Sequence, residues 1–121
     1  MSARILAVDD STSMRQMVAF ALRSAGYDVT EAEDGLVALE KAKNDKFNAV
    51  VADVNMPNMD GISLIRELRK LPDYRFTPLL MLTTEAGLDK KQEGKAAGAT
   101  GWLVKPFNPE QLIATLQKVL G

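Results

Sequence analysis

Short apolar runs alternate along the chain with segments of helical periodicity. Four runs are compact and apolar, and those over residues 49–52 and 79–82 are typical of strands buried on both faces of a sheet. A fifth alternates between polar and apolar residues, so we expect that strand to be more exposed. The predicted strands cover residues 5–8, 27–32, 49–52, 79–82 and 102–104. Apolar residues at spacings of three and four predict helices over residues 12–25, 35–44, 61–70, 88–97 and 109–120.

The predicted helices begin and end at residues suited to those positions. Ser11 is a good N-cap, Gly26 is a typical stop, and Asn108 precedes Pro109 at the start of the last helix. The helix over residues 88–97 is the weakest, because Gly94 inside it costs about 1 kcal/mol relative to alanine. Residues 71–77 read as a polar loop.

Strand followed by helix, five times with short connections, predicts an α/β fold. Such an order gives a parallel sheet with helices on both faces. The 121 residues suffice for one hydrophobic core, and no linker, repeat or low-complexity stretch interrupts them. We therefore expect a single domain over residues 1–121, with no output domain.

Composition removes several classes of function. The chain has no cysteine and no histidine, which excludes disulfides, zinc–thiolate sites, Ser–His hydrolases and an internal phosphohistidine. A net charge of −1 gives no reason to expect nucleic-acid or membrane-surface binding. There is neither a signal peptide nor an apolar run of about 18 residues, so we expect a cytoplasmic protein.

The ends of the predicted strands carry the chemistry. In a parallel sheet all carboxyl ends lie on one edge, where ligands bind in open α/β folds. That edge would receive Asp9 and Asp10 from the first strand, Asp53 from the third, Thr83 from the fourth and Lys105 from the fifth. Two carboxylates about 4 Å apart repel by about 4 kcal/mol at an effective dielectric of 20, so the cluster calls for a cation. Oxygen ligands favour a hard ion such as Mg²⁺.

Each residue alone has an ordinary interpretation as a turn, cap or surface residue, but five such residues at four strand ends are together specific. A carboxylate beside Mg²⁺ and a lysine is a plausible nucleophile toward phosphorus. Two other classes fit less well. A haloacid-dehalogenase-type phosphohydrolase would need an acid where Asn55 stands, and a flavodoxin-like electron carrier would have its flavin phosphate repelled by Asp9 and Asp10.

Taken together, Asp9-Asp10, residues 53–61, Thr83 and residues 105–107 resemble a response-regulator receiver domain over the whole chain. Within that family the chain is most similar to the stand-alone chemotaxis regulators. The resemblance implies a flavodoxin-like sheet of strand order 2-1-3-4-5. It also implies that Asp53 accepts a phosphoryl group and that Mg²⁺ is bound by Asp10 and Asp53 directly, by Asp9 through water, and by the backbone carbonyl of Asn55.

The same resemblance assigns the remaining residues. Lys105 would contact the phosphoryl group, and Thr83 would move onto it. Trp102 takes the aromatic switch position, which is usually Tyr or Phe in the family. The bond between Lys105 and Pro106 would be cis. Asn55 and Glu85, at positions that influence water attack on the phosphoryl group, suggest fast self-dephosphorylation.

The implied partners are a sensor histidine kinase that supplies the phosphoryl group and a flagellar motor switch protein that receives the signal, with a phosphatase possible. The protein would then be a monomeric switch that catalyses its own phosphorylation and dephosphorylation, and no other reaction. Two alternatives within the family stay open at this point. The chain could be a phosphorelay intermediate that passes the group to another histidine, or a receiver that acts as a phosphate sink.

Overall fold

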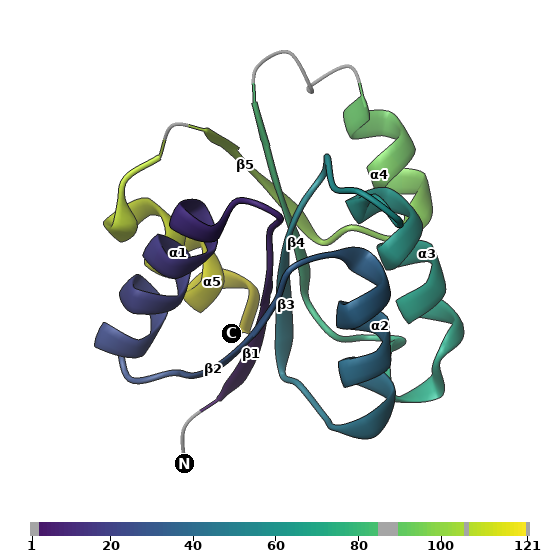
Figure 1. Cartoon of the computed structure of the whole chain (residues 1–121), viewed down its shortest axis with the longest axis horizontal. Coiled ribbons are helices and arrows are strands. Elements are labelled where there is room, and N and C mark those ends of the chain that lie inside the picture. Colours follow the sequence, from purple (N-terminus) through teal and green to yellow (C-terminus); the bar gives the residue numbers. More distant parts are fainter. Residues whose placement is uncertain (1–2, 85–89, 106, 121) are drawn as a thin grey trace.

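Five parallel strands form the centre of the molecule. The computed structural model describes residues 3–84, 90–105 and 107–120. The strands are β1 (Arg4–Val8), β2 (Asp28–Ala32), β3 (Ala49–Asp53), β4 (Leu79–Thr84) and β5 (Gly101–Lys105), and they lie in the order β2-β1-β3-β4-β5 (Figure 1). All four neighbouring pairs are parallel. The flavodoxin-like strand order expected from the sequence is confirmed.

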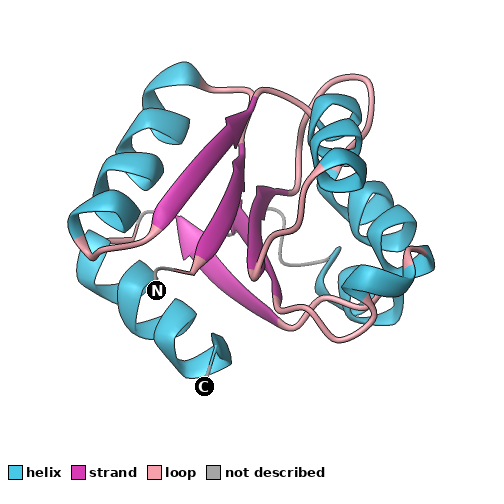
Figure 2. Cartoon of the chain, turned by 90° about the horizontal axis from the view of Figure 1, so that it is seen from below, coloured by secondary structure: helices cyan, strands magenta, loops and turns pink. Residues whose placement is uncertain are grey.

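Helices cover both faces of this sheet. They are α1 (Thr12–Ser24), α2 (Gly35–Asn44), α3 (Gly61–Lys70), α4 (Lys91–Ala97) and α5 (Pro109–Leu120). α1 and α5 pack on one face, while α2, α3 and α4 pack on the other (Figures 1 and 2). The predicted three-layer α/β arrangement is therefore confirmed. Leu88 and Asp89, which we predicted as the start of the fourth helix, lie outside the described residues.

The core is divided into two by the sheet, because successive strand residues point to opposite faces. Val50 joins the cluster beneath α2, α3 and α4, whereas Val51 joins the cluster beneath α1 and α5. Every residue of β3 is buried, as expected for the central strand. β2 lies at the edge of the sheet and is only partly buried, which confirms its predicted exposure.

Side-chain caps fix the helix starts as predicted. Ser11 Oγ accepts a hydrogen bond from the backbone nitrogen of Met14 (3.3 Å), and Asn108 Oδ1 accepts one from that of Gln111 (2.8 Å). Asp34 and Asp60 cap α2 and α3 in the same way. Each carboxylate cap lies at a helix N-terminus, where the helix dipole favours negative charge.

The prediction of a polar loop over residues 71–77 is wrong in one respect. It contains a short 3₁₀ helix (Pro72–Tyr74), and Tyr74 is only 1% exposed. The Tyr74 hydroxyl lies 2.8 Å from the carbonyl oxygens of both Ala42 and Asp45, at the end of α2. A three-residue element is too short to leave a periodic pattern, so the anchoring role of this tyrosine was not readable in the sequence.

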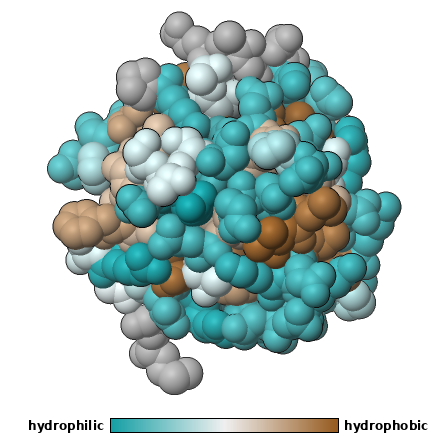
Figure 3. All heavy atoms as spheres, in the orientation of Figure 1, coloured by the Kyte–Doolittle hydropathy of each residue, from teal (hydrophilic) through white to brown (hydrophobic). Residues whose placement is uncertain are grey.

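The face of the molecule seen in Figure 3 is mainly hydrophilic. In the view of Figure 3 a hydrophobic area lies over α2 and α3, within hydrophilic surroundings. Large hydrophobic side chains that are exposed in the described part of the chain are Phe20, Leu36 and Phe76. In the described ranges, no helix is both long enough and apolar enough to cross a membrane.

Candidate functional site

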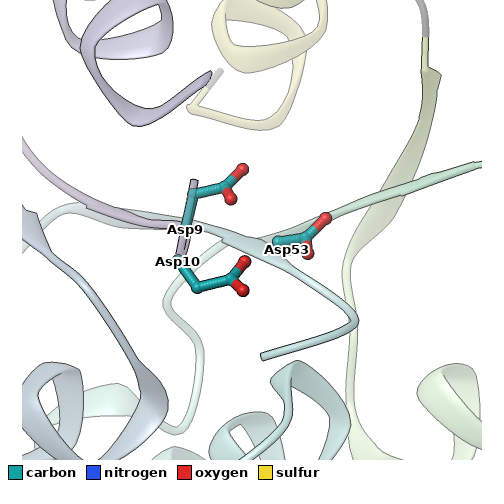
Figure 4. A group of neighbouring side chains, drawn as sticks. All are labelled: Asp9, Asp10 and Asp53. Carbon is teal, nitrogen blue, oxygen red and sulfur yellow. The ribbon is translucent and has the colours of Figure 1, made fainter. Parts of the chain in front are cut away.

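Three carboxylates converge at the carboxyl edge of the sheet. Asp9 follows β1, Asp10 comes next in the chain, and Asp53 ends β3. Each offers a carboxylate oxygen, and these oxygens all lie within 4.8 Å of one another. Figure 4 shows the side chains reaching into the same space. Asp9 and Asp53 are buried, whereas Asp10 is exposed to solvent.

The sheet register creates this proximity. Val8 lies opposite Ala52, so the residues that follow them, Asp9 and Asp53, leave the sheet side by side. The backbone nitrogen of Ser11 donates to Asp9 Oδ1 at 3.0 Å, which fixes the carboxylate against the turn. Arg15 Nη1 donates to the backbone oxygen of Asp9 at 2.8 Å, a contact across the turn that sequence reasoning did not anticipate.

Lys105 brings a positive charge to the cluster from the end of β5. Its ammonium Nζ lies 2.6 Å from Asp53 Oδ1 and 3.5 Å from Asp9 Oδ2. Burial raises the pKa of Asp53; the hydrogen bond and charge of Lys105 oppose this, and the charges of Asp9 and Asp10 add to it. Burial acts to lower the pKa of Lys105, but its contacts with Asp53 and Asp9 outweigh this and raise it.

The donor set fits a hard divalent cation. One ammonium faces three carboxylates, so the described residues leave negative charge without a partner. All the donors are carboxylate oxygens, as Mg²⁺ prefers, and the site opens to solvent, which suits an ion that keeps several waters. An open cavity of about 550 Å³ adjoins the cluster, lined by Asp10, Asn55, Met56, Pro57, Asp60 and Lys90. Asn55 thus lies at the edge of the predicted metal site.

Comparisons with known proteins identify the family. A family model for the response regulator receiver domain matches residues 5–117. The chain belongs to the response-regulator receiver family. It is 42% identical over 117 residues to the chemotaxis protein CheY-3 of Vibrio cholerae, with 96% of this chain and 90% of that protein covered.

Solved structures of receiver domains agree with this fold. The chemotaxis response regulator CheY4 of Vibrio cholerae has a TM-score of 0.94 and 57% identity, with 98% of this chain and 99% of that chain covered. The receiver domain of a sensor histidine kinase from Pseudomonas aeruginosa has a TM-score of 0.92 and 32% identity, with 100% and 99% covered. That structure holds a magnesium ion in its active-site cleft.

Thr83, the predicted switch hydroxyl of this receiver domain, lies close to the acidic cluster. It is 1% exposed and comes one residue after Leu82, which is the register partner of Asp53. Its Oγ1 donates to the backbone oxygen of Thr84 at 3.2 Å. Thr83 therefore lies one residue beyond the register partner of Asp53, and its hydroxyl donates to the backbone of its own strand.

Trp102, the predicted aromatic switch, packs inward. The side chain lies against the core beneath α2, α3 and α4 and is half-buried. Its indole Nε1 is buried and has no hydrogen-bond partner among the described residues. Gly94 of α4 faces the ring, and a Cβ at that position would overlap the indole atom Cζ2. The glycine that weakens the helix by propensity is therefore the residue that makes room for the tryptophan.

Two further predictions of receiver chemistry lie outside the described residues. Glu85, expected to influence water attack, and Pro106, expected to follow a cis bond, both fall there. The described residues bring Asp9, Asp10, Asp53 and Lys105 together and place Thr83 and Asn55 beside them. Trp102 stands apart, on the side of β5 that faces α4.

Proposed function

We propose that this receiver domain is the phosphorylation-operated response regulator of a chemotaxis pathway. Asp53 takes a phosphoryl group from a phosphohistidine of a CheA-like sensor histidine kinase, and the phosphorylated domain then binds a flagellar motor switch protein. The observation that carries this proposal is the position of Asp53, beside two other carboxylates and 2.6 Å from the Lys105 ammonium. The chemotaxis names of the relatives support the choice of pathway.

The residues divide the work between metal binding and phosphoryl transfer. Asp10 and Asp53 would hold Mg²⁺ directly, Asp9 through water, and Asn55 through its backbone oxygen. When bound, Mg²⁺ supplies positive charge that stabilises the oxygens of the transferring phosphoryl group. A carboxylate oxygen of Asp53 forms the new bond to phosphorus as the bond from phosphorus to the imidazole nitrogen breaks. The product on this chain is an acyl phosphate.

Lys105 keeps the nucleophile ionised before the reaction. Burial favours the protonated form of Asp53, and a protonated carboxyl is a poor nucleophile, so the opposing charge of Lys105 is needed. Once the phosphoryl group is attached, the ammonium that lay 2.6 Å from Asp53 is in reach of the new anionic oxygens.

The signal would pass from Asp53 through Thr83 to Trp102. The added negative charge attracts the Thr83 hydroxyl away from the backbone oxygen of Thr84. That movement frees space behind β4 and shifts Trp102, which changes the surface formed by α4, β5 and α5. We propose that the protein works as a monomer in the cytoplasm, in keeping with a diffusible messenger between kinase and motor.

The phosphorylation step is tested with a small phosphodonor. With Mg²⁺, the wild-type protein should gain the mass of one phosphoryl group, which mild base should remove, and Asp53→Asn should gain none because an amide is not a nucleophile. Asp60→Asn is the matched control, since Asp60 lines the same cavity and asparagine also caps helices. Incorporation into Asp53→Asn would move the chemistry to another residue.

The output is tested by capture on immobilised motor switch protein. Phosphodonor and Mg²⁺ should increase binding of the wild type but not of Asp53→Asn. Lys105→Arg should accept the phosphoryl group and yet bind weakly, because a planar guanidinium replaces a compact ammonium. A phosphorylated form that is stable for hours and returns its phosphoryl group to a histidine protein would instead support a phosphorelay role.

A further inference from the structure

The loop between β3 and α3, residues 54–60, is held at its beginning and at its end. Asp53 precedes it, and Asn55 within it supplies the backbone oxygen of the proposed metal site. The backbone nitrogen of Gly61 donates to the carbonyl of Val54 at 2.9 Å. Gly61 also lies so close to the chain that a Cβ there would overlap the carbonyl oxygen of Asp53. Both ends of the loop are therefore fixed beside the acidic cluster.

The middle of the same loop rests on the N-terminus of α2, an element that contributes no residue to the metal site. Asn58 Nδ2 donates to Asp34 Oδ2 at 2.9 Å. The next residue, Met59, packs closely against Gly35 at the start of α2. A Cβ on Gly35 would overlap the carbonyl oxygen of Met59. Glycine at position 35 thus permits an approach of the loop that any other residue would prevent.

Asp34 serves the loop and the helix with one carboxylate. Its Oδ1 accepts from the backbone nitrogen of Val37 at 2.9 Å and caps α2, which leaves Oδ2 for Asn58. The bond from Val37, and after it the bond from Asn58, holds the pKa of Asp34 below its usual value. The acceptor is therefore ionised at neutral pH, which strengthens both hydrogen bonds.

Asn58 occupies an uncommon backbone conformation. Its φ of 67° makes it the one described non-glycine residue in the left-handed region. Asparagine tolerates this region better than most residues, but the conformation still needs support from its surroundings. The bond to Asp34 and the turn closed by Met59 N and Pro57 O (2.7 Å) supply that support.

We propose that Asp34 and Asn58 form a clasp that positions the β3–α3 loop, and with it the Asn55 carbonyl, for divalent-cation binding. The proposal rests on the function proposed above. It makes the two residues positioning residues, since neither lies among the proposed metal ligands. Without the clasp, the loop would have to be ordered when the cation binds, and the cost of ordering would weaken affinity. We expect a loss of roughly three- to tenfold in Mg²⁺ affinity.

Two variants remove the hydrogen bond from opposite sides. Asp34→Ser keeps an N-cap for α2 but lacks the second oxygen that reaches Asn58. Asn58→Gly keeps a residue that accepts φ near 67° but lacks the donor. Titration calorimetry with Mg²⁺ should show weaker binding in both. The double variant should bind no more weakly than Asn58→Gly, because both changes remove the same contact.

Hydrogen exchange of the metal-free proteins gives a readout independent of binding. In both variants the backbone amides of residues 55–60 should exchange faster than in the wild type. Those of α2 should stay protected in Asp34→Ser, which shows that the helix is intact. Asn58→Gly in the Asp34→Ser background measures the added flexibility of the glycine itself.

The outcomes separate the clasp from the proposed function. Unchanged Mg²⁺ affinity in both variants, with a wild type that binds Mg²⁺ and accepts a phosphoryl group, would overturn the clasp alone. Effects of the two variants that add fully in the double variant would also overturn it, since they would not share a contact. A wild type that binds no Mg²⁺ would overturn the proposed function together with the clasp.

Discussion

A partly buried cationic side chain lies at each end of the parallel strands, the carboxyl edge and the amino edge. The two differ in the charge of the groups that they contact. At the carboxyl edge, Lys105 faces the carboxylates of Asp9 and Asp53, with Asp10 nearby. At the amino edge, Arg69 of α3 faces neutral oxygen atoms. It donates to the backbone oxygens of Gly98, Tyr74 and Thr77 and to the Thr100 hydroxyl, at 2.6–3.3 Å.

This difference suggests that the amino edge contributes mainly to folding stability and the carboxyl edge mainly to cation binding. Arg69 joins the segments that enter β4 and β5 and donates to partly buried carbonyl groups, so hydrogen-bond acceptors at that edge are satisfied within the protein. The carboxyl edge has more negative charge than Lys105 balances, so neutralising it requires a cation from solution, as in the proposed function. Substitutions at the amino edge should therefore lower the free energy of unfolding, whereas substitutions at the carboxyl edge should weaken Mg²⁺ binding.

The largest expected effect on folding is at the amino edge. Arg69→Met leaves several carbonyl groups without their donor, and we expect the free energy of unfolding to fall by about 3 kcal/mol. Urea denaturation measures this. Arg66→Met is the control on the same helix. Among the described residues Arg66 makes an exposed ion pair with Glu93 at 3.8 Å, so this variant should lose about 0.5 kcal/mol or less. Equal losses in the two variants would remove the distinction between the edges.

Tyr74→Phe probes the same edge with a single atom. Removing the hydroxyl leaves the carbonyl oxygens of Ala42 and Asp45 without this donor, so we expect a loss of about 1–2 kcal/mol in unfolding free energy. Tyr27→Phe is the control, because it removes the same hydroxyl from a tyrosine that is only partly buried. A Tyr74→Phe protein as stable as the control would show that water replaces the hydroxyl without cost.

A substitution at the carboxyl edge should raise the free energy of unfolding of the metal-free protein, where substitutions at the amino edge lower it. Asp10→Asn removes one of three neighbouring carboxylate charges, so the metal-free protein should become more stable by about 1 kcal/mol or less. The same change should weaken Mg²⁺ binding at least about tenfold. Thermal unfolding across a magnesium titration measures both, since stabilisation follows RT ln(1 + [Mg²⁺]/Kd). A wild-type melting temperature that does not respond to Mg²⁺ would contradict the metal site.

The smallest effect concerns pH. Burial, the main cause, raises the pKa of Asp53 above its ordinary value of 3.8, so the folded chain binds this proton more tightly than the unfolded chain. The contribution of Asp53 to stability therefore decreases as pH rises from 3.8 through the raised pKa, and Mg²⁺ affinity increases over the same range. Calorimetric Mg²⁺ titrations and urea denaturation from about pH 4 to pH 7 check both trends, and Asp53→Asn should remove them.

The sequence predicted the five strands, the five α-helices and the convergence of Asp9, Asp53 and Lys105, because these follow from patterns within single strands and helices. The apolar runs located β1, β3 and β4, and the residue after each run identified Asp9, Asp53 and Thr83. The strand order came from the family resemblance, since periodicity does not determine which strands are neighbours. Lys105 was placed at the correct edge, but its 2.6 Å contact with Asp53 depends on side-chain conformation.

Side-chain contacts between elements that are distant in the chain could not be predicted from the sequence. The hydrogen bond from Asn58 to Asp34 joins residues 24 positions apart, and no spacing rule relates them. Tyr74 lies in an element too short to be periodic, and its hydroxyl caps a helix 29 or more residues away. Such contacts are set by how the layers pack, which the sequence pattern describes only in outline.

The close packing of Trp102 on Gly94 has a consequence for engineering. A side chain at position 94 would overlap the indole in its present position, so an exchange of α4 that introduces one requires Trp102 to move or to be replaced. A chimaera that takes its fourth helix from another receiver domain, with alanine or a larger residue at this position, should also take that domain's smaller aromatic residue at position 102. Residues 94 and 102 are therefore coupled, and directed evolution of the proposed output surface should vary them together.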